Sequence, residues 1–120
     1  MRFMGLMRMA ENVGPPPAAL IEAMGKSLEE QFRTGRITDA GGLMPNATIA
    51  RVSSNELVVT DGPYAEGTEV IGGYSILNVD SYEEARAMAQ QVVQLHLDFW
   101  PGWEGACELR EITDGPPEPN

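Results

Sequence analysis

The sequence predicts an α+β fold in which two helices cover one face of an antiparallel sheet. Two stretches have helical periodicity, residues 15–34 and 81–99, and the runs around them have the two-residue period of strands. The order is strand–helix–strand, then a hairpin, then strand–helix–strand. That order is the ferredoxin-like βαββαβ plan with an inserted β-hairpin.

Length and composition indicate one domain and exclude several classes of partner. The chain has 120 residues, and we expect residues 1–113 to form one domain and the polar, proline-rich residues 114–120 to be a disordered tail. Eighteen acidic and eight scattered basic residues give a net charge of −10, so we expect no direct nucleic-acid binding and no binding to anionic membranes. No apolar run is long enough to cross a bilayer, and the single Cys107 cannot form an internal disulfide, so we expect a cytoplasmic protein.

The first half contains a strand at residues 2–9 and a helix that we expect to begin at Pro15–Pro17 and to end near Thr34, with Gly35 as the residue after its end. A short strand follows at residues 37–43. The inner stripe of the helix is expected to contain Leu20, Ile21, Met24, Leu28 and Phe32.

The middle of the chain predicts a hairpin. Residues 47–52 and 56–60 alternate in polarity on either side of Ser53-Ser54-Asn55. The next strand, residues 70–79, contains Gly72-Gly73, which suggests a bulge or a close backbone approach.

The second helix begins with a capping box, in which Ser81 is the N-cap and Glu84 the third helical residue. We expect it to end near Phe99 and residues 104–112 to form the last strand. Its inner stripe is expected to contain Ala85, Met88, Ala89, Val92, His96 and Phe99.

Two strands, residues 2–9 and 70–79, are apolar on both faces. Two helices cover only one face of a sheet, so the other face needs a second cover. The simplest one is another copy of the chain, and we therefore expect a two-fold homodimer.

Two ionisable residues are candidates for catalysis. Asp61 follows a strand at an Asp-Gly-Pro turn and is either a general base or ligand contact, or a turn residue that bonds its own backbone. His96, the only histidine, is central in the inner stripe of the second helix. It is either a functional imidazole or a buried side chain satisfied by one hydrogen bond.

Further candidates for ligand binding lie between residues 60 and 74. They are Tyr64, Glu66, Gly72, Gly73 and Tyr74, and for the tyrosines the alternative is packing in the core or an interface. Glu66 and Glu69 with Asp61 either hold a cation or form a solvated acidic loop; because no histidine or cysteine lies at ligand spacing, the loop is favoured and we expect no metal site. We also expect no cofactor. Trp100 and Trp103 either close a pocket or pack against a second subunit, and Cys107 is expected to be an inert, buried thiol.

The run Val-Val-Thr-Asp-Gly-Pro-Tyr-Ala-Glu at residues 58–66, followed by residues 69–74, resembles the DGPF-motif branch of the YCII-related family. Residues 108–112 extend the resemblance, and Tyr64 replaces the usual phenylalanine. The resemblance implies a dimeric α+β barrel. It implies no settled reaction, although a His-Asp pair is associated with the YCII proteins and extracytoplasmic-function sigma factors with this branch.

Two functions are therefore in view. The first is a small, cofactor-independent enzyme that acts on a small organic molecule by proton transfer, in isomerase- or lyase-like chemistry, with Asp61 and His96 as catalytic residues. The second is a non-catalytic ligand-binding or accessory module associated with a sigma factor, which the resemblance implies.

Overall fold

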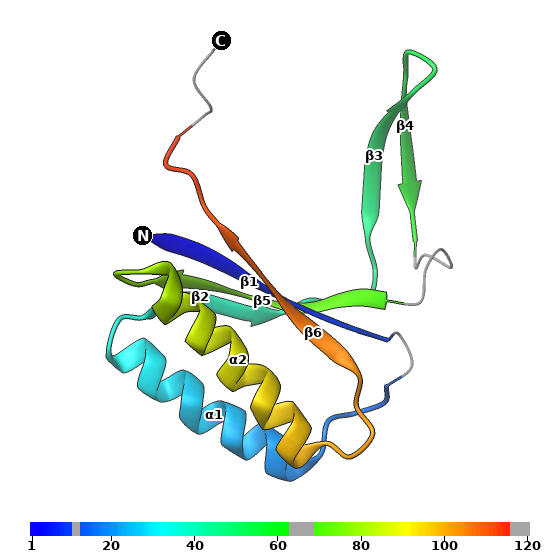
Figure 1. Ribbon diagram of the computed structural model, residues 1–120. Coiled ribbons are helices and arrows are strands. Elements are labelled where there is room, and N and C mark those ends of the chain that lie inside the picture. The colour runs from blue at the N-terminus through cyan, green and yellow to red at the C-terminus, as the bar shows by residue number, and fades with distance from the viewer. Residues whose placement is uncertain (11–12, 63–68, 116–120) are drawn as a thin grey trace.

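The computed structural model describes residues 1–10, 13–62 and 69–115 (Figure 1). Its helices and strands follow one another in the order that the sequence predicts. In chain order they are β1 (Arg2–Ala10), α1 (Ala18–Arg33), β2 (Ile37–Gly42), β3 (Thr48–Ser53), β4 (Glu56–Asp61), β5 (Glu69–Asn78), α2 (Tyr82–Phe99) and β6 (Gly105–Glu111).

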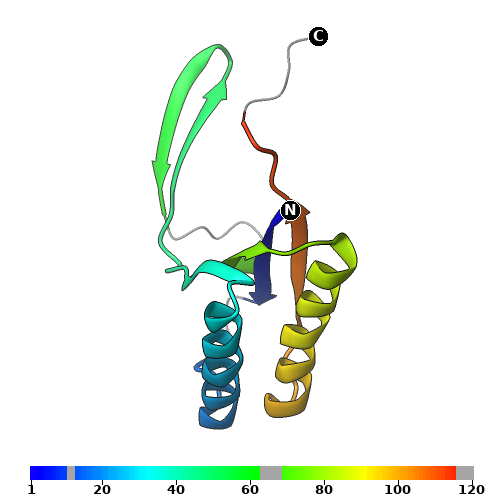
Figure 2. The same ribbon diagram turned by 90° about the vertical axis from the view of Figure 1, so that its left-hand side faces the viewer.

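Two layers make up the body of the molecule. The strands β2, β5, β1 and β6 form a four-stranded sheet in that order, and every neighbouring pair is antiparallel. Both helices lie side by side on one face of this sheet (Figure 2). This arrangement confirms the predicted ferredoxin-like α+β plan, and it leaves the opposite face, here called the open face, without a helical cover.

The inserted hairpin is a separate two-stranded sheet that stands away from the body on the open-face side (Figure 1). Its loop is one residue shorter than predicted, because Ser53 pairs with Glu56 in the ladder. The turn is Ser54-Asn55, and both residues have positive φ, 53° and 62°, as a two-residue hairpin turn matched to strand twist requires.

Helix α1 begins three residues later than predicted, since Pro15 and Pro16 precede its N-cap, Pro17. It ends as predicted, with Gly35 at a φ of +78° after the C-cap. The predicted inner stripe is wrong at its edges. Ile21 is 58% and Phe32 45% exposed, whereas Gln31 is buried at 8% exposure. The buried side of α1 is therefore shifted toward Gln31 from the predicted stripe.

Helix α2 has the predicted capping box. The Ser81 hydroxyl accepts a hydrogen bond from the Glu84 backbone N–H at 3.1 Å, and the Glu84 carboxylate accepts one from the Asp80 N–H at 3.2 Å. Ala85 and His96 are buried as predicted, but the prediction for Phe99 is wrong, because its side chain is 39% exposed where the helix ends.

Strand register sorts the side chains under the helices into cross-strand rows of decreasing size. The first row is Ile37, Leu77 and Phe3, all buried, and these form the core with Val79 and Ala85. The second row is Ala40, Ser75, Gly5 and Leu109. The third row is Gly42, Gly73, Met7 and Cys107. Tight packing is therefore confined to one end of the helix–sheet interface.

The pair Gly72-Gly73 forms the bulge that the sequence suggests. Met7 pairs with Gly73 and Arg8 with Ile71, so Gly72 has no partner across the ladder. A Cβ atom at Gly72 would lie 2.9 Å from the terminal methyl of Met9. The bulge thus brings bare backbone against a methionine on the helix side of the sheet.

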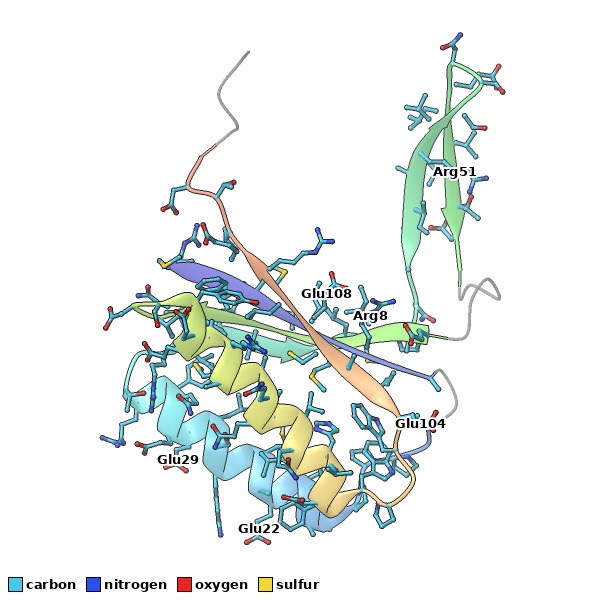
Figure 3. The ribbon with its side chains drawn as sticks, in the orientation of Figure 1. Arg8, Glu22, Glu29, Arg51, Glu104 and Glu108 are labelled. Atoms are coloured by element: carbon cyan, nitrogen blue, oxygen red, sulfur yellow. The ribbon has the colours of Figure 1, made fainter. Side chains whose placement is uncertain are left out.

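The open face combines apolar side chains with a small ionic network. Arg8 binds Glu69 at 2.8 Å and Glu108 at 3.0 Å, and Glu108 also binds Arg110 at 2.8 Å. Figure 3 shows Arg8 and Glu108 on the side of the sheet away from the helices.

Neither helix in the described part of the chain has the length and apolar character needed to span a membrane.

The cap at Ser81 should contribute measurably to stability. Replacing Ser81 by alanine leaves the Glu84 N–H without its acceptor and should lower the free energy of unfolding by about 1 kcal/mol. Urea unfolding followed by circular dichroism would measure this. Ser81→Thr retains a capping hydroxyl and should lose less than half as much, so equal losses in the two variants would contradict the role of the cap.

Candidate functional site

A cavity of about 400 Å³, here called the helix–sheet cavity, lies between the sheet and the two helices. It occupies the space that the small second and third rows leave open, because Gly5, Gly42 and Gly73 project no side chain toward the helices. Four methionines form much of the remaining wall: Met7, Met9, Met24 and Met88.

The lining of this cavity is neutral. It contains no aspartate, glutamate, lysine or arginine among the described residues. Besides Tyr74, its polar side chains come from both helices and from the sheet: Ser27, Gln31, Ser75, Gln91, His96 and Cys107. An apolar concavity with a few converging polar groups is the usual form of a small-molecule site.

His96 is held in a defined tautomer and orientation. Its Nδ1 lies 2.8 Å from the Val92 carbonyl oxygen. A carbonyl only accepts hydrogen bonds, so we assign the proton to Nδ1, and Nε2 is then the ring nitrogen with a free lone pair. No described residue is hydrogen-bonded to Nε2. Although His96 is only 6% exposed, it lines the cavity and can therefore act as a base within it.

Two tryptophans after α2 support this imidazole. The His96 ring lies 4.4 Å from the Trp103 ring and 6.3 Å from the Trp100 ring, centroid to centroid. The indole of Trp103 packs directly over Gly105, where a Cβ atom would collide with it and with the Arg8 carbonyl oxygen. The sequence predicts that Trp100 and Trp103 either close a pocket or pack against a second subunit. In the structure both rings lie beside the His96 ring within one protomer.

Gln31 is a second polar residue of the cavity wall with an unused hydrogen-bond acceptor. Its Oε1 is buried and has no hydrogen-bond partner in the described structure. A buried acceptor without a partner costs about 1–3 kcal/mol, so a ligand that donates a hydrogen bond to it would recover that energy. Sequence analysis missed Gln31, because a glutamine beside a helix stripe is normally solvated.

Cys107 lies in the third row and is half-buried between β1 and the cavity. Burial raises the pKa of its thiol, and a backbone hydrogen bond with Leu6 partly opposes this. The thiolate is the reactive form, so this environment fits the inert thiol that the sequence predicts.

Asp61 lies away from this cavity. It is the last residue of β4, at the base of the hairpin, and its carboxylate accepts a 2.6 Å hydrogen bond from the Thr48 hydroxyl. Asp61 is not among the residues that line the cavity containing His96. Within one protomer the described structure therefore does not bring the two predicted catalytic residues together.

The other predicted ligand-binding residues divide into three groups. Gly72 and Gly73 line the cavity. Tyr74 also borders it, but its ring packs against Gly41, and its hydroxyl donates a 3.1 Å hydrogen bond to Asp39, which raises the pKa of the phenol. Tyr64 and Glu66 lie outside the described residues. The described residues contain no cluster of three or more histidine, cysteine or acidic side chains suited to a metal ion.

Comparison with known families assigns the chain. The model of the YCII-related domain matches residues 1–97, from β1 to within α2. The chain belongs to the YCII-related domain family. The match includes Gln31, His96 and the glycines Gly5, Gly42 and Gly73, and it ends before Trp100, Trp103 and β6. A search of the curated proteins finds no match.

The reactivity of Cys107 tests the cavity wall. Because burial raises its pKa, alkylation by iodoacetamide at about pH 8 should be slower in the folded protein than in the urea-unfolded chain. The folded-state rate should rise with pH over a range above that of the unfolded chain. Mass spectrometry would follow both rates, and equal rates would show that the thiol is not protected.

Proposed function

We propose that the helix–sheet cavity binds a small neutral organic molecule and that His96 exchanges a proton with it. The observation that carries this proposal is a buried imidazole whose Nδ1 is fixed by the Val92 carbonyl, on the wall of a cavity without charged residues. Fixing one nitrogen leaves the other as the proton acceptor, which is the arrangement that general-base catalysis requires.

The chemistry follows from the lining. A neutral imidazole can take a proton from an acidic C–H of the bound molecule and return it at another carbon, which is isomerisation. If the bond to a leaving group on the adjacent carbon breaks instead, the imidazolium gives its proton to that leaving group, which is elimination. Gln31 would hold the molecule by an adjacent polar group. Asp61 takes no part in proton transfer in this scheme. Its carboxylate lies outside the cavity and accepts a 2.6 Å hydrogen bond from the Thr48 hydroxyl at the base of the hairpin.

A non-catalytic module would use the same cavity for binding alone. That alternative, including association with a sigma factor, is supported by the resemblance of the central motif to the DGPF branch. It differs from the enzyme in one observable: the bound molecule would exchange no proton with the protein.

Proton exchange can be measured directly with a model ketone. 2-Indanone is neutral and bicyclic, and it has acidic C–H bonds beside its carbonyl. In D₂O the wild-type protein should accelerate loss of the C–H signal by up to about 100-fold over buffer, the lower range of general-base contributions. His96→Gln should abolish this acceleration without preventing binding.

The matched control fills the cavity instead of removing the base. A Cβ at Gly42 would be 3.9 Å from its nearest neighbour, so Gly42→Leu should fold and block the cavity. Binding without exchange in the wild type would favour the non-catalytic module. If 2-indanone does not bind and has no effect on His96, the proposal is overturned.

We propose further that the protein is a homodimer in which a second copy covers the open face. Half-buried apolar side chains gather there, among them Leu6, Tyr74 and Ile76. The projecting hairpin adds exposed apolar surface, with Val52 at 80% and Leu57 at 73% exposure. An isolated two-stranded hairpin is marginally stable in water, so contact with a partner would account for this one.

Light scattering tests the dimer. At micromolar concentration the protein should have twice the 13.0 kDa chain mass, and high salt should not dissociate it, because apolar burial drives the association. Leu6→Glu should give a monomer. Ala87→Glu, which places the same charge on the exposed side of α2, should not. A monomeric wild type would contradict this proposal.

A further inference from the structure

We infer that the ligand of the helix–sheet cavity is flat, uncharged and equipped with an N–H or O–H hydrogen-bond donor. This inference rests on the proposed function of the cavity and adds the class of molecule that the cavity selects. Three properties of the lining carry it: a floor of bare backbone, two unpaired acceptors and an absence of charge.

The floor accounts for the flat shape. Gly42 and Gly73 face each other across β2 and β5, and Gly72 bulges beside them. A Cβ at Gly42 would be in ordinary contact at 3.9 Å, so close packing does not require glycine there. Gly42 and Gly73 thus leave a patch of peptide planes on which a planar ring can lie, while Met9 packs over the neighbouring Gly72.

The methionines complete the contact surface. Met7 and Met9 come from β1, Met24 from α1 and Met88 from α2, so polarisable side chains surround the glycine patch from both layers. Sulfur makes favourable contacts with aromatic rings, and methionine adapts to irregular shapes. A cavity of about 400 Å³ exceeds the roughly 150 Å³ that suffices for benzene, so it has room for two fused rings.

Unpaired acceptors account for the donor. Gln31 Oε1 is buried without a partner in the described structure, and the tautomer of His96 leaves Nε2 as an acceptor. Both residues line the cavity, from α1 and α2 respectively. A ligand with a single N–H or O–H can satisfy one of them, whereas a ligand with acceptors only would leave both unpaired.

The uncharged lining of the cavity excludes charged ligands. The described lining offers no arginine or lysine to a carboxylate or phosphate and no carboxylate to an ammonium group. A charged ligand would lose its hydration without gaining a partner. The chain's net charge of −10 further opposes anions.

Indole and benzofuran provide a matched pair of probes, since they share size and shape and differ in whether the ring carries an N–H donor or an ether oxygen. Methionine methyl signals in a ¹³C-labelled wild-type protein would report binding, because four methionines line the cavity. Indole should bind roughly tenfold more tightly than benzofuran, the equivalent of one hydrogen bond. N-Methylindole should bind like benzofuran.

The acceptor is tested by Gln31→Met, which keeps the length of the side chain and removes its oxygen. The preference for indole should fall at least several-fold in this variant. It should persist in Gln90→Met, in which the same change is made at an exposed position of α2. If Gln31→Met does not fold, the comparison of indole with N-methylindole in the wild type still decides whether the ligand must carry a hydrogen-bond donor.

The outcomes separate this inference from the proposed function. Equal binding of indole, N-methylindole and benzofuran in the wild type would overturn the donor requirement and leave the cavity as a ligand site. A preference for indole that survives Gln31→Met unchanged would overturn the assignment of Gln31. Failure of all three probes to shift any of the cavity methionines would overturn both the inference and the proposed function.

Discussion

The decrease in side-chain size across the sheet is the constraint on which the rest of the structure depends. Antiparallel register places Ile37, Leu77 and Phe3 in one row and Gly42, Gly73 and Met7 in another, on the same face. The helices pack closely over the first row, where Phe3 is 1% exposed. Over the second of these rows Gly42 and Gly73 present no side chains to the helices, and the space above them remains as the cavity. Protein interiors are normally close-packed, so an apolar space of this size sacrifices dispersion contacts that a bound molecule would restore.

The cavity and the position of His96 are consequences of the same packing. The first row fixes α2 against the sheet through Ala85, which is fully buried. His96 lies eleven residues, about three turns, further along the same helix face, over the end of the sheet that carries the small residues. Trp103 supports it from behind because Gly105 leaves room for the indole. A buried imidazole is therefore held beside an open space without the carboxylate partner that the family resemblance suggests.

Periodicity and capping signals were enough to predict the fold. Ser81 and Glu84 identified the start of α2, Gly35 the end of α1, and the alternation of β1 and β5 the strands. The site was less accessible to sequence reasoning. Gly72 and Gly73 were recognised as a bulge, but Gly42 joins them only through the β2–β5 register, which no local pattern encodes. Gln31 is buried although it lies outside the apolar stripe of α1, so its burial depends on how the helix is rotated against the sheet, which the sequence pattern does not encode. Tyr64 and Glu66, which the central motif indicates as ligand-binding residues, lie outside the described residues.

Gly5, Gly42 and Gly73 hold open an apolar cavity between the sheet and the helices. Xenon tests this most directly, because this atom enters empty apolar cavities without hydrogen bonds or charge. The measurement is the change in methionine methyl chemical shifts under xenon pressure. The account predicts saturable shifts for Met7, Met24 and Met88, which line the cavity, and none for Met44, which is 81% exposed on the loop after β2. Uniformly small shifts at all methionines, or none, would mean that the helices close over the glycine rows in solution, and would contradict the account.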